Sequence, residues 1–184
     1  MVARIMTIIL TAAICVCWAD EPAIVELGDM TVVGMQSLVS MKHNVIKELW
    51  TRFMESGYEI EYMKDEGVYV GISWGYKEVG KGKEEKKETQ FFHLVGAPVT
   101  EMSELPEGFT HKTISAQMYA RFVHKGPLSK LGETYDYIFV TWLPESGYLY
   151  DTGKCDIELY DERFKSGEED SEFDIYVPII EKTE

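Results

Sequence analysis

Two stretches of the chain place apolar side chains at the three- to four-residue spacing of an amphipathic helix. In the first stretch, residues 41–56, these side chains are Val45, Ile46, Leu49, Trp50 and Phe53. In the second stretch, from Pro127 to about Leu143, they are Leu128, Leu131, Tyr135, Ile138, Phe139 and Trp142. Gly57 is a stop signal after the first stretch, and Pro127 suits the first turn of a helix. We predict one helix in each stretch.

Around these helices, apolar and polar residues alternate as they do in β-strands. The predicted strands cover residues 23–36 (with a kink at Gly28 and Asp29), 67–75, 91–96, 112–124, 154–160 and 173–180. Residues 77–90 are almost all Lys, Glu and Gly, which predicts a solvated hairpin connection. Residues 98–109 predict a linker between two halves of the chain.

The sequence ESGY occurs twice, at residues 55–58 and 145–148, each time directly after an aromatic helix. The same shift of ninety positions carries the strand at 68–70 onto the strand at 158–160. Each half therefore predicts the order strand–helix–strand–strand, which indicates an internal duplication.

The predicted fold class is α+β, with two tandem strand–helix–strand–strand repeats in one domain, residues 23–182. The halves cover about residues 23–97 and 110–182. Because neither half can bury both faces of a small sheet alone, we expect them to pair about a pseudo-twofold axis, with antiparallel sheets and the helices on the outer face. The opposite face would curve into a central groove suited to a small-molecule pocket.

The predicted strand at 154–160 contains the candidate residue for ligand binding or catalysis, Glu158. Its apolar residues at 155, 157 and 159 alternate with Asp156, Glu158 and Tyr160. If the apolar set faces the helices, Glu158 and Tyr160 face the groove. A carboxylate in a partly dry cleft loses hydration and recovers that energy from a cationic ligand. The same environment raises the pKa of a carboxyl group, which would also suit Glu158 for general acid–base catalysis.

Aromatic side chains would add cation–π attraction of roughly 0.5–2 kcal/mol per good contact. The candidates for the pocket walls are Trp74, Tyr119, Trp142, Tyr160, Phe173 and Tyr176. Two simpler interpretations stay open at this point. Glu158 could be an exposed strand residue paired with a surface lysine, and each aromatic side chain could belong to the core.

The amino-acid composition and the net charge limit the classes of partner that we expect. The chain has 184 residues, of which 45% are hydrophobic and 27% charged, as in soluble globular proteins. The net charge of −14 disfavours nucleic-acid backbones and anionic membrane surfaces, since both repel such a protein. It favours either simple solubility or a preference for cationic ligands.

Residues 1–19 have the layout of a secretory signal peptide, with Arg4 before a short apolar run that ends at Ala19. Cleavage after Ala19 would make the protein secreted or periplasmic. The alternatives for this segment are a buried first strand or an uncleaved anchor. Without cleavage, the protein would be cytoplasmic. The leader contains Cys15 and Cys17, so Cys155 would remain alone and is expected to be a small buried hydrophobe.

The spacings of the cysteines and of the four histidines match no metal site, and no cofactor or metal is predicted. The chain also has no nucleophile elbow followed by a helix and no phosphate-binding glycine loop.

The second half contains a specific order of blocks: YARF at 119–122, HKGP at 124–127, WLPESGY at 142–148, IELY at 157–160 and FDIYVP at 173–178. With these blocks, roughly residues 23–180 resemble the GyrI-like small-molecule-binding domain. This domain is also the effector-binding module of bacterial transcription regulators of the AraC and multidrug-binding types.

The resemblance implies a tandem strand–helix–strand–strand fold and a central hydrophobic pocket with an acidic residue that contacts cationic or lipophilic ligands. Glu158 stands where the family has its pocket glutamate, Trp142 matches the aromatic residue at the helix end, and Phe173 matches the one that opens the last strand. The chain has no room for a DNA-binding module, so we expect no direct contact with nucleic acid.

Three functions therefore compete. The first is a binding module for cationic or lipophilic small molecules. The second is a hydrolase that opens strained, cyclopropane-type rings with Glu158 and an activated water, as some similar proteins do. The third, by fold analogy alone, is a haem or tetrapyrrole binder with His43, His93 or His124 as an axial ligand. The oligomeric state and the physiological ligand are not predicted.

Overall fold

The computed structural model describes residues 21–40, 42–79 and 88–183. The signal peptide predicted over residues 1–19, together with Cys15 and Cys17, lies outside the described residues and stays a prediction. Within the described ranges, no helix combines the length and the apolar character needed to cross a membrane.

The elements follow the predicted periodicities. The strands are β1 (Ala23–Leu27), β2 (Met30–Ser40), β3 (Tyr69–Val79), β4 (Glu88–Val99), β5 (Thr110–Ile114), β6 (Gln117–Lys125), β7 (Tyr148–Tyr150), β8 (Asp156–Tyr160) and β9 (Glu172–Glu181). The helices are α1 (Ile46–Glu55), α2 (Leu131–Asp136) and α3 (Leu143–Glu145), with a short 3-10 turn (Leu128–Lys130) before α2 and a π-helical stretch (Tyr137–Trp142) between α2 and α3.

The sheet is antiparallel, and its strand order reproduces the predicted duplication. The order is β1-β6-β9-β8-β3-β4-β2-β5, with β7 paired to β9. From the central pair β8 and β3 outward, the second half contributes β8, β9 and β6, and the first half contributes the corresponding β3, β4 and β2. The α+β class with two tandem strand–helix–strand–strand repeats is confirmed.

The two ESGY segments form the same turn. In the first, the Ser56 hydroxyl donates to the Phe53 carbonyl at 2.7 Å and accepts the Tyr58 amide at 3.2 Å. In the second, the Ser146 hydroxyl donates to the Leu143 carbonyl at 2.9 Å and accepts the Tyr148 amide at 3.2 Å. The repeated letters therefore encode one local structure that ends the helix in each half.

Several boundaries differ from the prediction. The loop predicted over residues 77–90 is wrong at both ends, because β3 continues to Val79 and β4 begins at Glu88. Charged side chains are compatible with an exposed hairpin ladder, so their density misled the prediction. The strand predicted at 112–124 is two strands, β5 and β6, and β7 was not predicted because three residues carry too little pattern.

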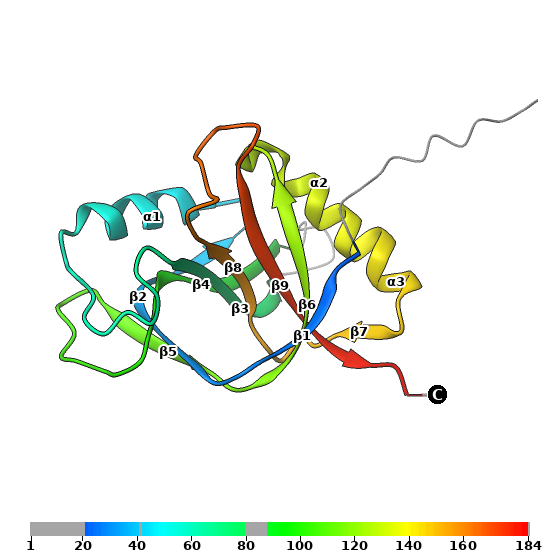
Figure 1. Cartoon of the computed structure of the whole chain (residues 1–184), viewed down its shortest axis with the longest axis horizontal. Helices are drawn as coiled ribbons and strands as arrows, with labels where there is room; N and C mark the ends of the chain where they lie inside the picture. Colours follow the sequence, from blue (N-terminus) through cyan, green and yellow to red (C-terminus); the bar gives the residue numbers. More distant parts are fainter. Residues whose placement is uncertain (1–20, 41, 80–87, 184) are drawn as a thin grey trace, which may run out of the picture.

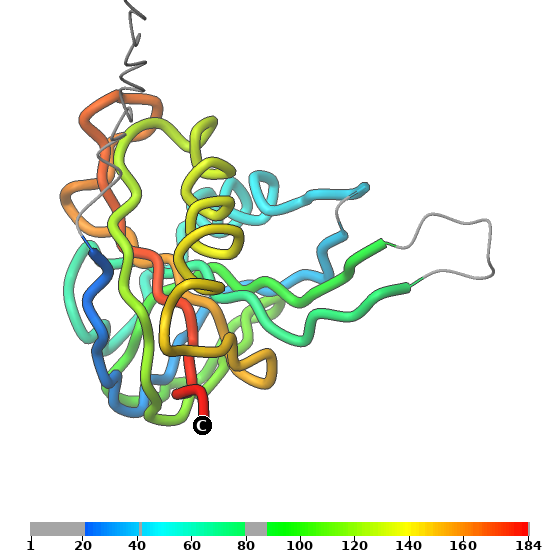
Figure 2. Tube along the Cα trace, turned by 90° about the vertical axis from the view of Figure 1, so that its right-hand side faces the viewer, coloured from blue at the N-terminus to red at the C-terminus, as the bar shows by residue number. Residues whose placement is uncertain are grey.

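Helix α1 and the second helical segment, which runs from residue 128 to residue 145, lie on one face of the sheet (Figures 1 and 2). Leu49 and Phe53 of α1 pack on Met35 and Val95 of the sheet. Beneath the second helical segment, Ile138 packs with side chains from β6 and β9, which are Ala120, Phe122, Phe173, Ile175, Val177 and Ile179.

The helix-free face is closed by curvature of the sheet. Its core brings together Val32 of β2, Ile114 of β5 and Tyr119 of β6, although β5 and β6 lie toward opposite ends of the strand order. Cys155 and Ile157 belong to this core, which confirms that Cys155 is a small buried hydrophobe. The side of the sheet that stays open is therefore the one between the two helices.

Candidate functional site

The strand register sets Glu158 in the gap between the helices. Paired positions across β4, β3, β8, β9 and β6 form one row on the helix face, and the row reads Val95, Gly71, Glu158, Ile175 and Phe122. Val95 lies under α1, and Ile175 and Phe122 lie under the second helical segment. The centre of the row is left to Glu158 and to a glycine.

Gly71 leaves room for two neighbouring side chains. A Cβ atom at this position would lie 3.1 Å from Cε1 of His93, closer than most Cβ contacts, and 3.4 Å from Oε2 of Glu158, an ordinary contact distance. A side chain here would therefore push against His93. His93 is buried, its Nδ1 lies 2.8 Å from the Ser73 hydroxyl, and burial lowers its pKa to about 4, so the ring is neutral.

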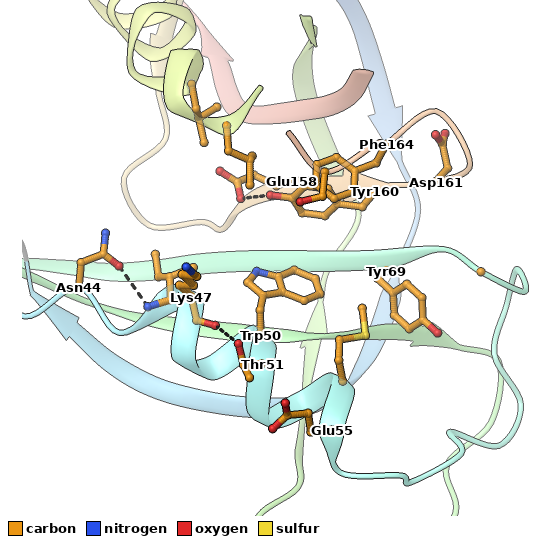
Figure 3. A pocket seen from close by; sticks show the side chains of 16 residues that line it. Asn44, Lys47, Trp50, Thr51, Glu55, Tyr69, Glu158, Tyr160, Asp161 and Phe164 are labelled. Carbon is orange, nitrogen blue, oxygen red and sulfur yellow. Dashed lines mark hydrogen bonds between the residues drawn. The ribbon is translucent and has the colours of Figure 1, made fainter. Parts of the chain in front are cut away.

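A cavity of about 820 Å³ opens over Glu158 between α1, β8 and the segment that follows β8 (Figure 3). It is large enough for a drug-sized ligand. It is lined by Asn44, Ile46, Lys47, Trp50, Thr51, Met54, Glu55, Gly67, Tyr69, Leu128, Leu131, Glu158, Tyr160, Asp161, Phe164 and Ser166. One wall is thus a single face of α1, which differs from the expected groove on the helix-free face.

Glu158 accepts two hydrogen bonds from tyrosine hydroxyls. Tyr135 of α2 donates to Oε1 at 2.7 Å, and Tyr160 of β8 donates to Oε2 at 2.8 Å. Burial raises the pKa of Glu158, and the two hydroxyls partly oppose that rise. Among the described residues, no lysine, arginine or histidine lies within ion-pair distance of this carboxylate. When this carboxylate is ionised, none of these residues compensates its charge by an ion pair.

Aromatic rings surround the carboxylate on the cavity side. The Tyr160 ring stacks on Phe173 with centroids 4.6 Å apart. It also makes edge contacts with Trp50 of α1 at 5.3 Å and with Phe164 at 4.9 Å. Rings in these orientations offer flat π faces and edges to a ligand.

The segment that follows β8 and carries Phe164 contains an arginine that forms ion pairs with two carboxylates. The Arg163 side chain donates to both oxygens of Asp161, with the shortest contact 2.7 Å, and also pairs with Asp174 at 3.1 Å. This pairing lowers the pKa of Asp161. The negative charge of Asp161 at the cavity is therefore already compensated by Arg163.

The structure brings only part of the predicted set to the cavity. Glu158 and Tyr160 line it, and Phe173 supports Tyr160 from behind. Trp142 packs against Phe122 at 5.1 Å in the core beneath the helix.

The other three predicted residues belong to the opposite face of the sheet. Tyr119 is fully buried and meets Tyr176 edge-on at 6.1 Å. Trp74 stacks on Phe92 at 5.6 Å, and the Lys112 ammonium lies 4.4 Å from its ring centroid. These three do not line the cavity, because the apolar set of β8 faces the helix-free core and not the helices.

Sequence reasoning missed Trp50 and Tyr135. Both stand at apolar positions of the predicted amphipathic helices, and neither was among the predicted pocket residues. One residue of a helical stripe can contact a cavity while its neighbours contact a sheet, so spacing alone does not separate these roles.

A family model described as the GyrI-like small molecule binding domain matches residues 20–180. A curated relative, the transcriptional regulator BrlR of Pseudomonas aeruginosa, is 32% identical over 157 residues, which cover 85% of this chain and 54% of BrlR. The chain thus spans about half the length of that relative.

Two solved structures have the same fold. SAV2435 bound to tetraphenylphosphonium has a TM-score of 0.64 at 15% identity, covering 88% of this chain and 94% of SAV2435. The integron cassette protein VCH_CASS2 of Vibrio cholerae has a TM-score of 0.60 at 15% identity, covering 87% of this chain and 96% of that protein.

Proposed function

The chain belongs to the GyrI-like small-molecule-binding family, and we propose that it binds lipophilic aromatic cations, with Glu158 as the counter-charge for the ligand. The observation that carries this proposal is the position of Glu158. Its half-buried carboxylate borders a cavity of about 820 Å³ and has only neutral tyrosine hydroxyls as hydrogen-bond donors among the described residues. A partly desolvated charge of this kind is stabilised by an opposite charge brought by the ligand.

The lining supports a flat, apolar ligand. Trp50, Tyr160 and Phe164 supply aromatic surface next to the carboxylate, and Met54, Leu128 and Leu131 supply aliphatic surface. SAV2435, which has the same fold, binds tetraphenylphosphonium, a lipophilic cation, in its solved structure. The net charge of −14 further supports a cationic small molecule over nucleic acid as the partner.

Calorimetric titration with tetraphenylphosphonium tests the proposal. Glu158→Gln keeps the shape of the side chain, removes its charge and replaces one accepting oxygen by an NH2 donor. We therefore expect affinity to fall about tenfold or more, which corresponds to ~1.4 kcal/mol or more. Glu26→Gln, on the exposed face of β1, is the matched control and should bind like the wild type. Equal affinities for all three proteins would remove Glu158 from the proposal.

Hydrolysis of strained rings is the second candidate, and the raised pKa of the buried Glu158 carboxyl favours it as a general acid or base. Incubation with a panel of cyclopropane-type electrophiles, followed by mass spectrometry, would detect turnover. Absence of any Glu158-dependent product would count against it. No observation supports the haem hypothesis, because none of His43, His93 and His124 is among the described residues that line the cavity. His93 and His124 are also buried, each with Nδ1 close to a hydroxyl group.

A further inference from the structure

The cavity has one basic side chain among the described residues that line it, Lys47. It lies in the first turn of α1, three positions before Trp50, so the two side chains are neighbours on one helix face. The ring of Trp50 contacts Tyr160, whose hydroxyl donates to Glu158. Lys47 therefore lies across the cavity from the region of β8 that carries Glu158 (Figure 3).

The Lys47 ammonium is not neutralised by the protein. No described carboxylate lies within ion-pair distance of it. Glu55 is eight residues further along α1, about 12 Å away at 1.5 Å rise per residue. Asp161 is paired with Arg163. The cavity thus has a half-buried carboxylate on one side and an exposed lysine without an ion pair on the other.

This arrangement has opposite effects on two kinds of ligand. A ligand with only a positive charge is attracted by Glu158 and repelled by Lys47. A ligand whose aromatic cation also bears an acidic group can place each charge opposite its complement, which gains attraction at both ends.

We propose that Lys47 is a specificity-determining residue that makes the cavity selective for amphoteric ligands, in which an aromatic cation carries an acidic substituent. The inference rests on the proposed function, because the cation of such a ligand faces Glu158 while its acidic group faces Lys47.

Two dyes form a matched pair of probes. Rhodamine B has a xanthylium cation and a free carboxylate at neutral pH, and its ethyl ester has the same cation without the negative charge. Both can be titrated by fluorescence anisotropy against the wild type and against Lys47→Gln, Lys47→Arg, Lys77→Gln and Glu158→Gln. Lys77 is an exposed lysine of β3 outside the cavity and controls for the change in net charge.

We expect Lys47→Gln to shift the ratio of the two affinities roughly fivefold toward the ester, a size typical of a partly exposed ion pair. Lys47→Arg, which keeps the charge, and Lys77→Gln should keep the wild-type ratio. Glu158→Gln should weaken the binding of both dyes.

The outcomes separate the two proposals. If Glu158→Gln weakens both dyes but Lys47→Gln leaves their ratio unchanged, the role of Lys47 is wrong and the proposed function stands. If Glu158→Gln binds both dyes like the wild type, Glu158 is not the counter-charge, and the role of Lys47 fails with it. If neither dye binds the wild type, the selectivity for amphoteric ligands is wrong, and the titration with tetraphenylphosphonium decides the proposed function.

Discussion

Asp156 and Glu158 lie two residues apart on β8, on the same face, and each accepts hydrogen bonds from two tyrosine hydroxyls. Asp156 receives Tyr76 at 2.6 Å and Tyr150 at 2.8 Å, both on Oδ2. Glu158 receives Tyr135 and Tyr160. Burial raises the pKa of both carboxyl groups, that of Asp156 to about 6. The two sites thus share the charge and the number of tyrosine donors, but each oxygen of Glu158 accepts one bond, whereas Oδ1 of Asp156 is buried without a partner.

What differs is the space beside each carboxylate. Glu158 is paired across the strands with Gly71 and borders the cavity. Asp156 is paired with Ser73, is only 6% exposed and is not among the residues that line the cavity. The donors of Asp156 come from β3 and β7, so this carboxylate ties two strands together. Of these two acids, only Glu158 borders the cavity.

The largest expected effect concerns stability and pH at Asp156. Because its pKa is about 6 in the folded state and near 4 when unfolded, ionisation destabilises the fold, and stability falls as pH rises between about 4 and 6. The loss is roughly 3 kcal/mol, at 1.36 kcal/mol per pKa unit. Urea unfolding across this range should show Asp156→Asn losing less stability than the wild type. Parallel curves for the two proteins would contradict the prediction.

The second prediction compares the loss of stability when a tyrosine donor is removed from Asp156 or from Glu158. Tyr150→Phe removes one of two donors from a carboxylate without a cavity, so we expect about 2 kcal/mol less stability at neutral pH. Tyr160→Phe should cost less than about 1 kcal/mol, because water in the cavity can replace the hydroxyl at Glu158. Equal losses in the free energy of unfolding would mean that the cavity does not distinguish the two sites.

The smallest expected effect concerns the rings beside each carboxylate. Trp50→Leu removes an aromatic wall of the cavity, and we expect roughly fivefold weaker binding of tetraphenylphosphonium. Phe91, which stacks on Tyr76, a donor to Asp156, is the matched control. Phe91→Leu should lower stability without changing affinity, and the reverse pattern in calorimetry would refute this division.

Much of the site could be predicted from local pattern. The alternation along residues 154–160 correctly put Glu158 and Tyr160 on one face, and the repeated ESGY segments correctly indicated the duplication. The predicted walls were less accurate. Tyr119, Tyr176 and Trp74 lie on the other face, whereas Trp50 and Tyr135, which lie at the site, were predicted only as apolar helix positions.

The sequence by itself determined the elements, the two-part order and the two residue sets of β8, because these depend on periodicities of two and 3.6 residues that neighbouring positions set. Only the tertiary structure decided which face of the sheet holds the cavity. That choice depends on how the sheet curves, which follows from pairings between distant strands such as β1 with β6 and β2 with β5. The curvature closes the helix-free face over its own core and leaves Glu158 at the bottom of the open space between the helices.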